Sequence, residues 1–301
     1  MTGDFPHTME RGREVRSRDA GGFDADLLVI GSGAAGMAAA IRGADLGRTV
    51  TIVESGTIGG TCVNVGCIPS KNLIAAAEHL QAARRGFPGI APFEPAVDWS
   101  AVIGQKRRLV EHLRQAKYVD VLAAYPQITV LRGRARFGND GAVEVDGRLL
   151  RAGAVVLATG TSPWAPPIPG LNEAGYSTST SIMDLEELPT SLVVLGASAV
   201  GLELGQTFAR FGTEVTVIDL LPRILPDEDP ELTDLLRRYL NDEGLTIHTG
   251  VRPSRVENRH GGLVVAVERD GEEIEVEADR ILVATGRRPN TEGLNLEMAG
   301  V

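Results

Sequence analysis

The feature that most constrains the fold of this 301-residue chain is a glycine-rich unit that occurs twice. The first copy, 26–54, runs from a short apolar stretch through GSGAAG and an Ala-rich stretch to a second apolar stretch ending in Glu54. The second copy, 192–219, has GASAVG in the same place and ends in Asp219. Each acidic residue lies 23 residues after the first glycine of its unit, and the two units are offset by 165 residues. This match predicts one local structure formed twice.

Each copy has the pattern of a strand, a glycine-rich turn and a helix, followed by a second strand. In such a βαβ unit the glycines let the backbone turn tightly and approach a pyrophosphate, and the acidic residue accepts hydrogen bonds from ribose hydroxyls. The sequence therefore predicts two dinucleotide sites, although two glycine-rich turns that bind nothing are the alternative. The expected cofactor contacts are Gly31, Gly33, Ala34, Ala35, Gly36 and Glu54, and in the second unit Gly196, Ser198, Val200, Gly201 and Asp219. Ser198 is a departure, because a glycine is expected at that position.

A second pair of repeats indicates how the domains are arranged. Apolar runs at 154–160 and 280–286 both end in Ala-Thr-Gly, and each closes the segment that follows one glycine unit. Four prolines between 162 and 170 are typical of a crossover between domains. We therefore expect an α/β fold of two Rossmann-like, three-layer domains, the second, 161–284, inserted in the first, 24–160 with 285–301.

Composition and charge exclude several other classes of protein. With 30 Lys and Arg against 40 Asp and Glu, the formal net charge is −10, which argues against nucleic acid as the main partner. No apolar stretch approaches the roughly 18 residues that a membrane span needs, so we expect no membrane association. Residues 1–22 lack the apolar segment of a signal peptide. We interpret them as a disordered tail or the product of a misplaced start codon, and we expect a cytoplasmic protein.

The chain has only two cysteines, Cys62 and Cys67, and both lie shortly after Glu54. Two cysteines are too few for the disulfide framework of a small secreted protein. In a regular α-helix, Cα atoms five residues apart are separated by roughly 8–9 Å, whereas a disulfide needs less than about 7 Å. The sequence therefore predicts a distorted helix here, which Gly66 and Pro69 allow.

We interpret this pair as a redox-active disulfide that electrons from a cofactor would cycle in a reducing cytosol. Lys71, one turn beyond Cys67, is placed to favour a thiolate or to polarise a flavin. Two buried free thiols are the simpler alternative. A metal site is disfavoured, because His and Asp do not occur nearby at ligand spacing.

The run 59–71, GGTCVNVGCIPSK, resembles the redox-active helix of the pyridine nucleotide–disulfide oxidoreductase family. The first glycine unit is similar to the FAD site of that family, and the second is similar to its nicotinamide nucleotide site. The run ATGRRPN at 284–290 is similar to its second strand-end motif. The resemblance covers 24–301 and assigns 24–160 with 285–301 to FAD and 161–284 to NAD(P)H. It implies hydride transfer from NAD(P)H to FAD, then passage of two electrons to the disulfide and on to a substrate.

The same resemblance implies roles for individual residues. Cys62 would be the interchange thiol that meets the substrate, and Cys67 would contact the flavin and form the charge-transfer pair. Lys71 and Glu203 match a Lys–Glu pair that the family places beside the flavin and nicotinamide. Further cofactor contacts are expected from Gly60, Thr61, Lys71, Thr159, Gly160 and Gly286.

Within the family the chain is most similar to the mercuric reductases, through Val63 and the stretches 113–118, 128–137 and 294–301. This implies Hg²⁺ as the substrate, held by Cys62 and Cys67, with Tyr176 near the metal. Soft thiolates are the ligands that a soft metal ion prefers. Ile68 and the run 219–226 are more like lipoamide dehydrogenase, so a disulfide or dithiol substrate stays open.

The choice of nicotinamide nucleotide depends on Asp219. An acid at this position accepts from an unmodified ribose and repels a 2′-phosphate, which favours NADH. Mercuric reductases usually use NADPH, so Asp219 is a departure for which Arg223, and less plausibly Arg210, would compensate. We therefore expect activity with either NADPH or NADH.

Family members continue beyond the equivalent of Val301 with a second FAD motif and a dimerisation domain, which is absent from this sequence. The resemblance implies a homodimer for a full-length form, and we expect the present chain to be monomeric. A protein of another class also stays open, namely a truncated nucleotide-binding fragment without turnover.

Overall fold

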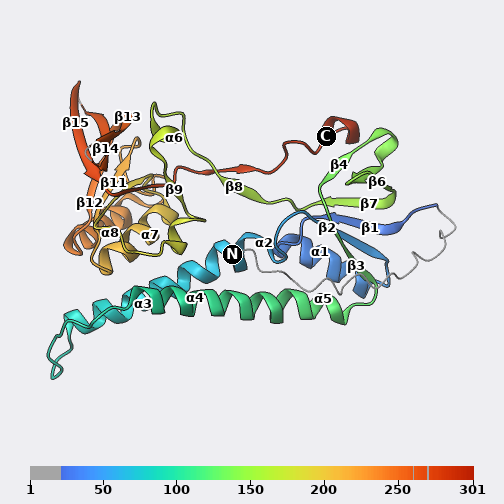
Figure 1. Ribbon diagram of the computed structural model, residues 1–301, viewed down its shortest axis with the longest axis horizontal. Coiled ribbons are helices and arrows are strands. Elements are labelled where there is room, and N and C mark those ends of the chain that lie inside the picture. The colour runs from blue at the N-terminus through green and yellow to red at the C-terminus, as the bar shows by residue number, and fades with distance from the viewer. Residues whose placement is uncertain (1–21, 260, 270) are drawn as a thin grey trace. The chain divides into compact units, whose positions relative to one another are not determined.

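The computed structural model describes residues 22–259, 261–269 and 271–301 (Figure 1). The predicted tail, 1–22, therefore lies outside the described residues except for Gly22. The chain divides into two compact units. The first comprises the described part of Met1–Gly56 with Leu122–Thr159 and Thr291–Val301, and the second comprises Thr57–Val121 with Gly160–Asn290. This division into compact units does not test the domain boundaries expected from the sequence, which stay a prediction.

The first unit contains a four-stranded parallel sheet in the order β3-β2-β1-β7. Its strands are β1 (Ala25–Ile30), β2 (Val50–Glu54), β3 (Ile128–Arg132) and β7 (Ala152–Leu157), and α1 (Ala34–Asp45) connects β1 to β2. An antiparallel sheet is formed by β4 (Ala135–Phe137), β5 (Val143–Val145) and β6 (Arg148–Leu150). The shorter helices are α5 (Asp120–Ala124), η2 (Asn139–Gly141) and η4 (Leu296–Ala299).

Alternation of side chains along β1 produces the layers of the first unit, because successive residues of a strand point to opposite faces. Leu28 and Ile30 share a buried cluster with Phe137 and Val143 of the antiparallel sheet. On α1 the buried residues are small or unbranched, which allows the helix to approach the parallel sheet closely. The parallel sheet therefore lies between a helix and a second sheet.

The second unit contains a five-stranded parallel sheet in the order β12-β11-β10-β16-β9. Its strands are β9 (Ser177–Thr178), β10 (Ser191–Leu195), β11 (Glu214–Asp219), β12 (Thr246–Thr249) and β16 (Arg280–Val283). An antiparallel sheet is formed by β13 (Arg252–Arg259), β14 (Gly262–Arg269) and β15 (Glu272–Ala278). A two-stranded antiparallel ribbon pairs β8 (Thr161–Pro163) with β17 (Arg287–Pro289).

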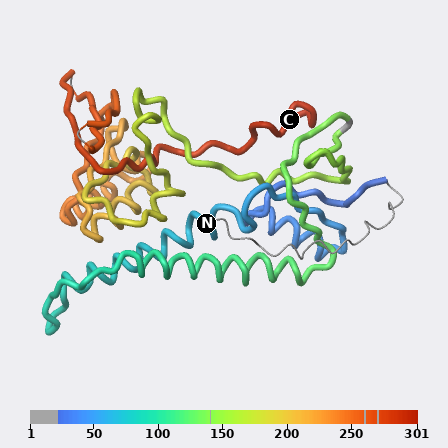
Figure 2. Tube along the Cα trace, viewed as in Figure 1, coloured from blue at the N-terminus to red at the C-terminus, as the bar shows by residue number. Residues whose placement is uncertain are grey.

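Helices of different lengths belong to the second unit. They are α2 (Gly60–Val65), α3 (Cys67–Arg85), α4 (Trp99–Arg114), η1 (Gln115–Val119), α6 (Leu171–Ala174), η3 (Ile182–Asp184), α7 (Ala199–Arg210) and α8 (Pro230–Asp242). Of these, α7 packs on β10 and β11, α8 contacts β12, α3 packs on α7, and α6 contacts β13. The long helices α3 and α4 lie side by side (Figures 1 and 2).

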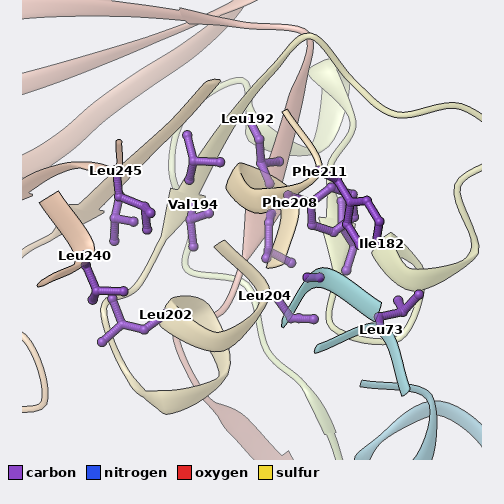
Figure 3. Packing of buried hydrophobic residues seen from close by; sticks show 14 of the residues in the cluster. Leu73, Ile182, Leu192, Val194, Leu202, Leu204, Phe208, Phe211, Leu240 and Leu245 are labelled. Carbon is purple, nitrogen blue, oxygen red and sulfur yellow. The ribbon is translucent and has the colours of Figure 1, made fainter. Parts of the chain in front are cut away.

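Strand β10 divides the core of the second unit in two. Leu192 and Val194 pack with Leu73 of α3 and Phe208 of α7, as Figure 3 shows. The residues between and after them, Val193 and Leu195, face the β13–β15 sheet. Both units therefore have the three layers expected from the sequence, and the α/β fold with parallel sheets is confirmed. Among the described residues, no helix is long and apolar enough to cross a membrane.

Candidate functional site

The glycine-rich turn of the first unit closes against the end of a neighbouring strand. Gly31 donates its backbone N–H to Val53 O at 2.8 Å, and its φ of +105° lies in the region that favours glycine. A Cβ at Gly31 would lie 2.3 Å from Ala158 O, at the end of β7. One turn into α1, a Cβ at Gly36 would lie 2.0 Å from Gly31 O. The turn accepts no side chain at either position.

The same geometry occurs in the second unit. Gly196 donates to Ile218 O at 2.8 Å and has a φ of +108°. A Cβ there would lie 2.6 Å from Ala284 O, and a Cβ at Gly201 would lie 2.0 Å from Gly196 O. The sequence repeat is therefore also a structural repeat. In both units a strand-end carbonyl oxygen and the carbonyl oxygen of the first glycine exclude side chains.

Each acidic residue is held by backbone N–H groups at the carboxyl end of its strand. Glu54 accepts from Ser32 N at 2.9 Å, from the Ser32 hydroxyl at 2.6 Å and from Gly56 N at 2.6 Å. Asp219 accepts from Ala197 N at 2.6 Å and from Leu221 N at 2.7 Å. These bonds fix both carboxylates beside their glycine-rich turns.

The two turns fit the dinucleotides expected there. Helices α1 and α7 begin after Gly33 and Ser198, and neither helix has a side-chain cap or an acidic residue in its first turn. Uncapped N–H groups and the helix dipole favour a pyrophosphate at such an end. The Ser198 hydroxyl donates to Ala284 O at 3.4 Å, so it does not cap α7. The side chains of Ala34, Ala35 and Val200 are exposed at these helix starts.

The other expected cofactor contacts lie at strand ends and at the start of α2. Gly160 O accepts from Asn290 N at 2.9 Å, and Gly286 O accepts from Trp164 N at 3.0 Å. Both glycines have positive φ values, +68° and +138°. Thr159 is half-buried, Gly60 is the first residue of α2 with a φ of +64°, and Thr61 is exposed.

The two cysteines lie on either side of a helix break. Helix α2 ends at Val65, Gly66 has φ −125° and ψ −113°, and α3 begins at Cys67. A Cβ at Gly66 would lie 3.3 Å from Cys62 Cα, which shows how closely the broken backbone folds onto the first cysteine. The helix distortion expected from the spacing is confirmed. Both cysteines are free thiols, with Cys62 half-buried and Cys67 exposed.

The thiols interact with each other. A hydrogen bond with Cys67, partial burial and the charge of Cys67 together raise the pKa of the Cys62 thiol. Cys62 therefore keeps its proton above the pH at which an isolated thiol would lose it. In the part of the chain that the structure describes, no three His, Cys, Asp or Glu side chains group as a metal site.

Lys71 and Glu203 meet although they are 132 residues apart. Lys71 lies on α3, one turn after Cys67, and its Nζ is 2.5 Å from Glu203 Oε1 on α7. The packing of α3 against α7 brings them together. Their side chains are about half exposed, 58% and 45%, so they form an accessible ion pair beside the cysteines rather than a buried one.

Tyr176 lies elsewhere in the second unit. Its side chain packs against the cluster that includes Val193 and Leu195, between the parallel sheet and the β13–β15 sheet. Helix α3 packs on the opposite face of the parallel sheet. The role of Tyr176 near a metal stays a prediction.

Sequence reasoning missed Tyr118 as a site residue. It lies on η1, a π-helical turn at the end of α4, and burial and the charges of Cys62 and Cys67 raise the pKa of its phenol. Arg114, one turn earlier, donates to Asn64 Oδ1 at 3.1 Å and so fastens this helix end to α2. The stretch LRQAKY carried the resemblance, but a π-helical turn has no sequence pattern that would single out its tyrosine.

Comparison with known proteins agrees with this geometry. Residues 25–301 match the family model described as pyridine nucleotide-disulphide oxidoreductase. The chain is 43% identical over 279 residues to a mercuric reductase of Staphylococcus aureus, covering 92% of this chain and 51% of that protein. It is 42% identical over 283 residues to a dihydrolipoyl dehydrogenase of Thermus scotoductus, covering 92% and 60%. The chain thus spans about half the length of the curated relatives it matches.

Solved structures show the same likeness. The HOCl-induced flavoprotein disulfide reductase RclA from Escherichia coli superposes with a TM-score of 0.81 at 31% identity. The match covers 92% of this chain and 60% of that one. With the family model matched over nearly the whole chain and both glycine-rich turns and the cysteine pair in place, the chain belongs to the pyridine nucleotide-disulphide oxidoreductase family.

Proposed function

We propose that this chain is the nucleotide-binding and disulfide-bearing part of a flavoprotein disulfide oxidoreductase. The observation that carries the proposal is the pair of interacting thiols at the Gly66 break, with the Lys71–Glu203 ion pair one turn beyond. The first unit's turn and Glu54 would hold FAD, and the second unit's turn and Asp219 would hold the nicotinamide nucleotide. In domain terms, 24–160 with 285–301 would bind FAD and 161–284 would bind NAD(P)H.

The chain's own residues would carry the electrons onward from the cofactors. Bound FAD would supply a carrier for the electron pair that NAD(P)H provides. The Cys62–Cys67 disulfide accepts that pair, its S–S bond breaks, and two protons complete two thiols. Cys67, at the N-terminus of α3, would face the flavin, and Cys62 would meet the substrate. Lys71 would stabilise negative charge near Cys67 while Glu203 holds its ammonium group in place.

The favoured substrate is Hg²⁺, as in mercuric reductases. Both thiols would lose their protons and bind the ion, and the two electrons that they hold would reduce it to Hg⁰ while the disulfide forms again. Mercuric reductases of several bacteria are 40–43% identical to this chain, which supports this substrate. Tyr176 would lie near the metal. The protein would act in the cytoplasm as a homodimer in a full-length form, with neither nucleic acid nor membrane as a partner.

A second candidate is dihydrolipoamide dehydrogenase. A dihydrolipoyl dehydrogenase is 42% identical to this chain, nearly as similar as the mercuric reductases. A third candidate, of another class, is a nucleotide-binding fragment without turnover.

One set of measurements separates the three candidates. The purified 301-residue chain would be mixed with FAD and reduced anaerobically with NADH or NADPH. A long-wavelength absorbance band supports the flavin–thiol contact, and loss of that band in Cys67→Ala assigns it to Cys67. Hg²⁺-dependent NAD(P)H oxidation supports mercuric reductase, lipoamide-dependent oxidation supports the second candidate, and a colourless chain supports the third.

Variants then assign the thiols. We expect Cys62→Ala to abolish metal-dependent turnover, whereas the control His79→Ala, exposed on α3, leaves it intact. Metal-dependent turnover that survives Cys62→Ala would show that Cys62 is not the interchange thiol.

A further inference from the structure

At the place where the second site would hold a ribose lies a carboxylate, that of Asp219, in a fixed position. Asp219 closes β11, and its two carboxylate oxygens are each held by one backbone N–H, from Ala197 at 2.6 Å and from Leu221 at 2.7 Å. A carboxylate held at both oxygens cannot swing aside. Its remaining lone pairs can accept from hydroxyl groups, but they repel a phosphate at the same place.

The first unit contains the same arrangement at its proposed FAD site. Glu54 is held by the backbone N–H groups of Ser32 and Gly56, at 2.9 and 2.6 Å. Each of these three residues has its counterpart 165 positions later, at Asp219, Ala197 and Leu221. The adenosine ribose of FAD has a free 2′-hydroxyl. The second site therefore repeats a geometry that is suited to an unmodified ribose.

The two arginines that would offset this charge are engaged elsewhere. Arg210 ends α7, beside the start of β11 and so at the opposite end of that strand from Asp219. It is bound to Glu243 by Nε–Oε2 and Nη2–Oε1 contacts of 2.8 and 3.0 Å. Only 14% of its side chain is exposed, which leaves it no reach toward a nucleotide.

Arg223 is closer in sequence but is also held. Its Nη2 donates to Pro226 O at 2.8 Å, and its Nη1 lies 3.4 Å from Thr233 Oγ1 on α8. Arg237, on the same helix, donates to Ile247 O at 3.1 Å and to Thr249 Oγ1 at 3.4 Å. These guanidinium groups bind the protein's own loop and strand ends.

We propose that the second site selects NADH and rejects the 2′-phosphate of NADPH, contrary to the dual use expected from the sequence. This rests on the proposed function, because it takes the second turn to be the nicotinamide nucleotide site. Asp219 is the residue that determines the specificity. Arg210 and Arg223, the cations that would otherwise reverse this preference, are bound within the protein, Arg210 in an ion pair and Arg223 by loop contacts.

The test is a binding measurement that needs no turnover. The affinity for ADP-ribose and for its 2′-phosphorylated form would be measured by calorimetry on the 301-residue chain saturated with FAD, which occupies the first site, with circular dichroism to check folding. We expect ADP-ribose to bind at least about tenfold more tightly than the phosphorylated form. Asp219→Asn should narrow that ratio by about tenfold, chiefly by improving binding of the phosphorylated form. Arg210→Ala and Arg223→Ala should leave the ratio unchanged.

Three results would overturn the proposal. Equal binding of the two ligands by the unaltered chain refutes selection while leaving the proposed function intact, and this ratio decides the matter even where Asp219→Asn does not fold. Selective loss of the phosphorylated ligand in Arg223→Ala, or in Arg252→Ala at the exposed start of β13, identifies a phosphate-binding cation. If neither ligand binds, the second unit has no nucleotide site, and the proposed function is refuted as well.

Discussion

At the scale of single residues, Gly36 and Gly201 show how little space the two glycine-rich turns leave for a side chain. At both positions the nearest atom to an added Cβ is the backbone oxygen of the first glycine, at 2.0 Å. Backbone cannot move away as the end of a flexible side chain can. The helix that starts at the turn can approach the strand only because these residues have no side chain.

Gly36→Ala should therefore lower the free energy of unfolding by about 1–3 kcal/mol, the usual range for overpacking, and weaken FAD binding. Gly138→Ala in the same unit is the matched control, because its Cβ would have 3.7 Å to the nearest atom, Ala142 O, and its φ is −107°. Urea denaturation of both variants checks this. Equal losses in the two would mean that the close approach at Gly36 has no energetic consequence.

The thiol pair makes a second prediction at this scale. The hydrogen bond with Cys67 and the charge of Cys67 hold the pKa of Cys62 above its usual value. Removing both in Cys67→Ala should lower that pKa, so that Cys62 reacts with iodoacetamide at lower pH than it does in the unaltered chain. The rate of alkylation against pH measures this, with Ser70→Ala as the control. An unchanged midpoint in Cys67→Ala would show that the two thiols do not interact.

At the scale of elements, three helices of the second unit end at one glutamate. Glu243, directly after α8, binds Arg210 at the end of α7 and Arg85 at the end of α3, the latter by an Nη2–Oε1 contact of 2.6 Å. Its side chain is only 7% exposed. An arginine at a helix C-terminus also interacts favourably with the helix dipole.

Glu243→Ala should lower the free energy of unfolding by about 3–5 kcal/mol, because it leaves a buried guanidinium without its partner. Glu275→Ala, in the exposed ion-pair network of Arg255 and Arg259 on β13 and β15, should have a much smaller effect, since exposed pairs contribute little. Thermal or urea unfolding compares the two. A loss at Glu243 no larger than at Glu275 would contradict a stabilising role for the helix-end cluster.

The α4–η1 junction shows an element that the sequence could not reveal. Tyr118 lies on the π-helical turn after α4, where burial and the charges of the two cysteines raise its pKa, and Arg114 binds Asn64 one turn earlier. Arg114 and Asn64 lie 50 positions apart, so their contact depends on how the chain folds. By contrast, the break at Gly66 follows from the local requirement that two cysteines five residues apart come together, and so it could be predicted.

At the scale of the whole molecule, stability should decrease as the solution becomes acidic. Hydrogen bonds from Thr49 hold the pKa of Asp26 below its usual value, and those from Thr190 and Ser191 do the same for Asp279. Burial acts to raise the pKa of Glu243, but its hydrogen bonds and neighbouring arginines outweigh burial and lower it. Burial and two neighbouring arginines lower the pKa of His248.

All four groups change the stability in the same direction as the pH falls. A group whose pKa is lower in the folded state stabilises the protein fully above its unfolded pKa and loses that contribution as the pH falls through the folded value. The free energy of unfolding should therefore begin to fall near pH 6.5, where His248 of the unfolded chain takes up a proton. It should fall more steeply below about pH 4, where the carboxylates do the same. Urea denaturation between pH 7 and pH 3 measures this. A flat profile would mean that these bonds persist in the unfolded chain.

The sequence by itself determined the parts of this protein that depend on local geometry. A turn that must approach a phosphate needs glycine, a ribose acceptor must follow the next strand, and a strand covered on both faces must be apolar throughout. The repeat of 165 residues, the three-layer architecture and the helix break at Gly66 were predictable for that reason.

Tertiary structure decided which distant side chains meet. Lys71 meets Glu203 because α3 packs on α7, Tyr118 approaches the cysteines across a π-helical turn, and Arg210 is bound by Glu243. In sequence, Arg210 is a cation near a nucleotide site, and only the fold shows that it lies at the other end of β11. The physical reason is that a charge acts at the place where packing puts its side chain, and sequence spacing specifies that place only within one element.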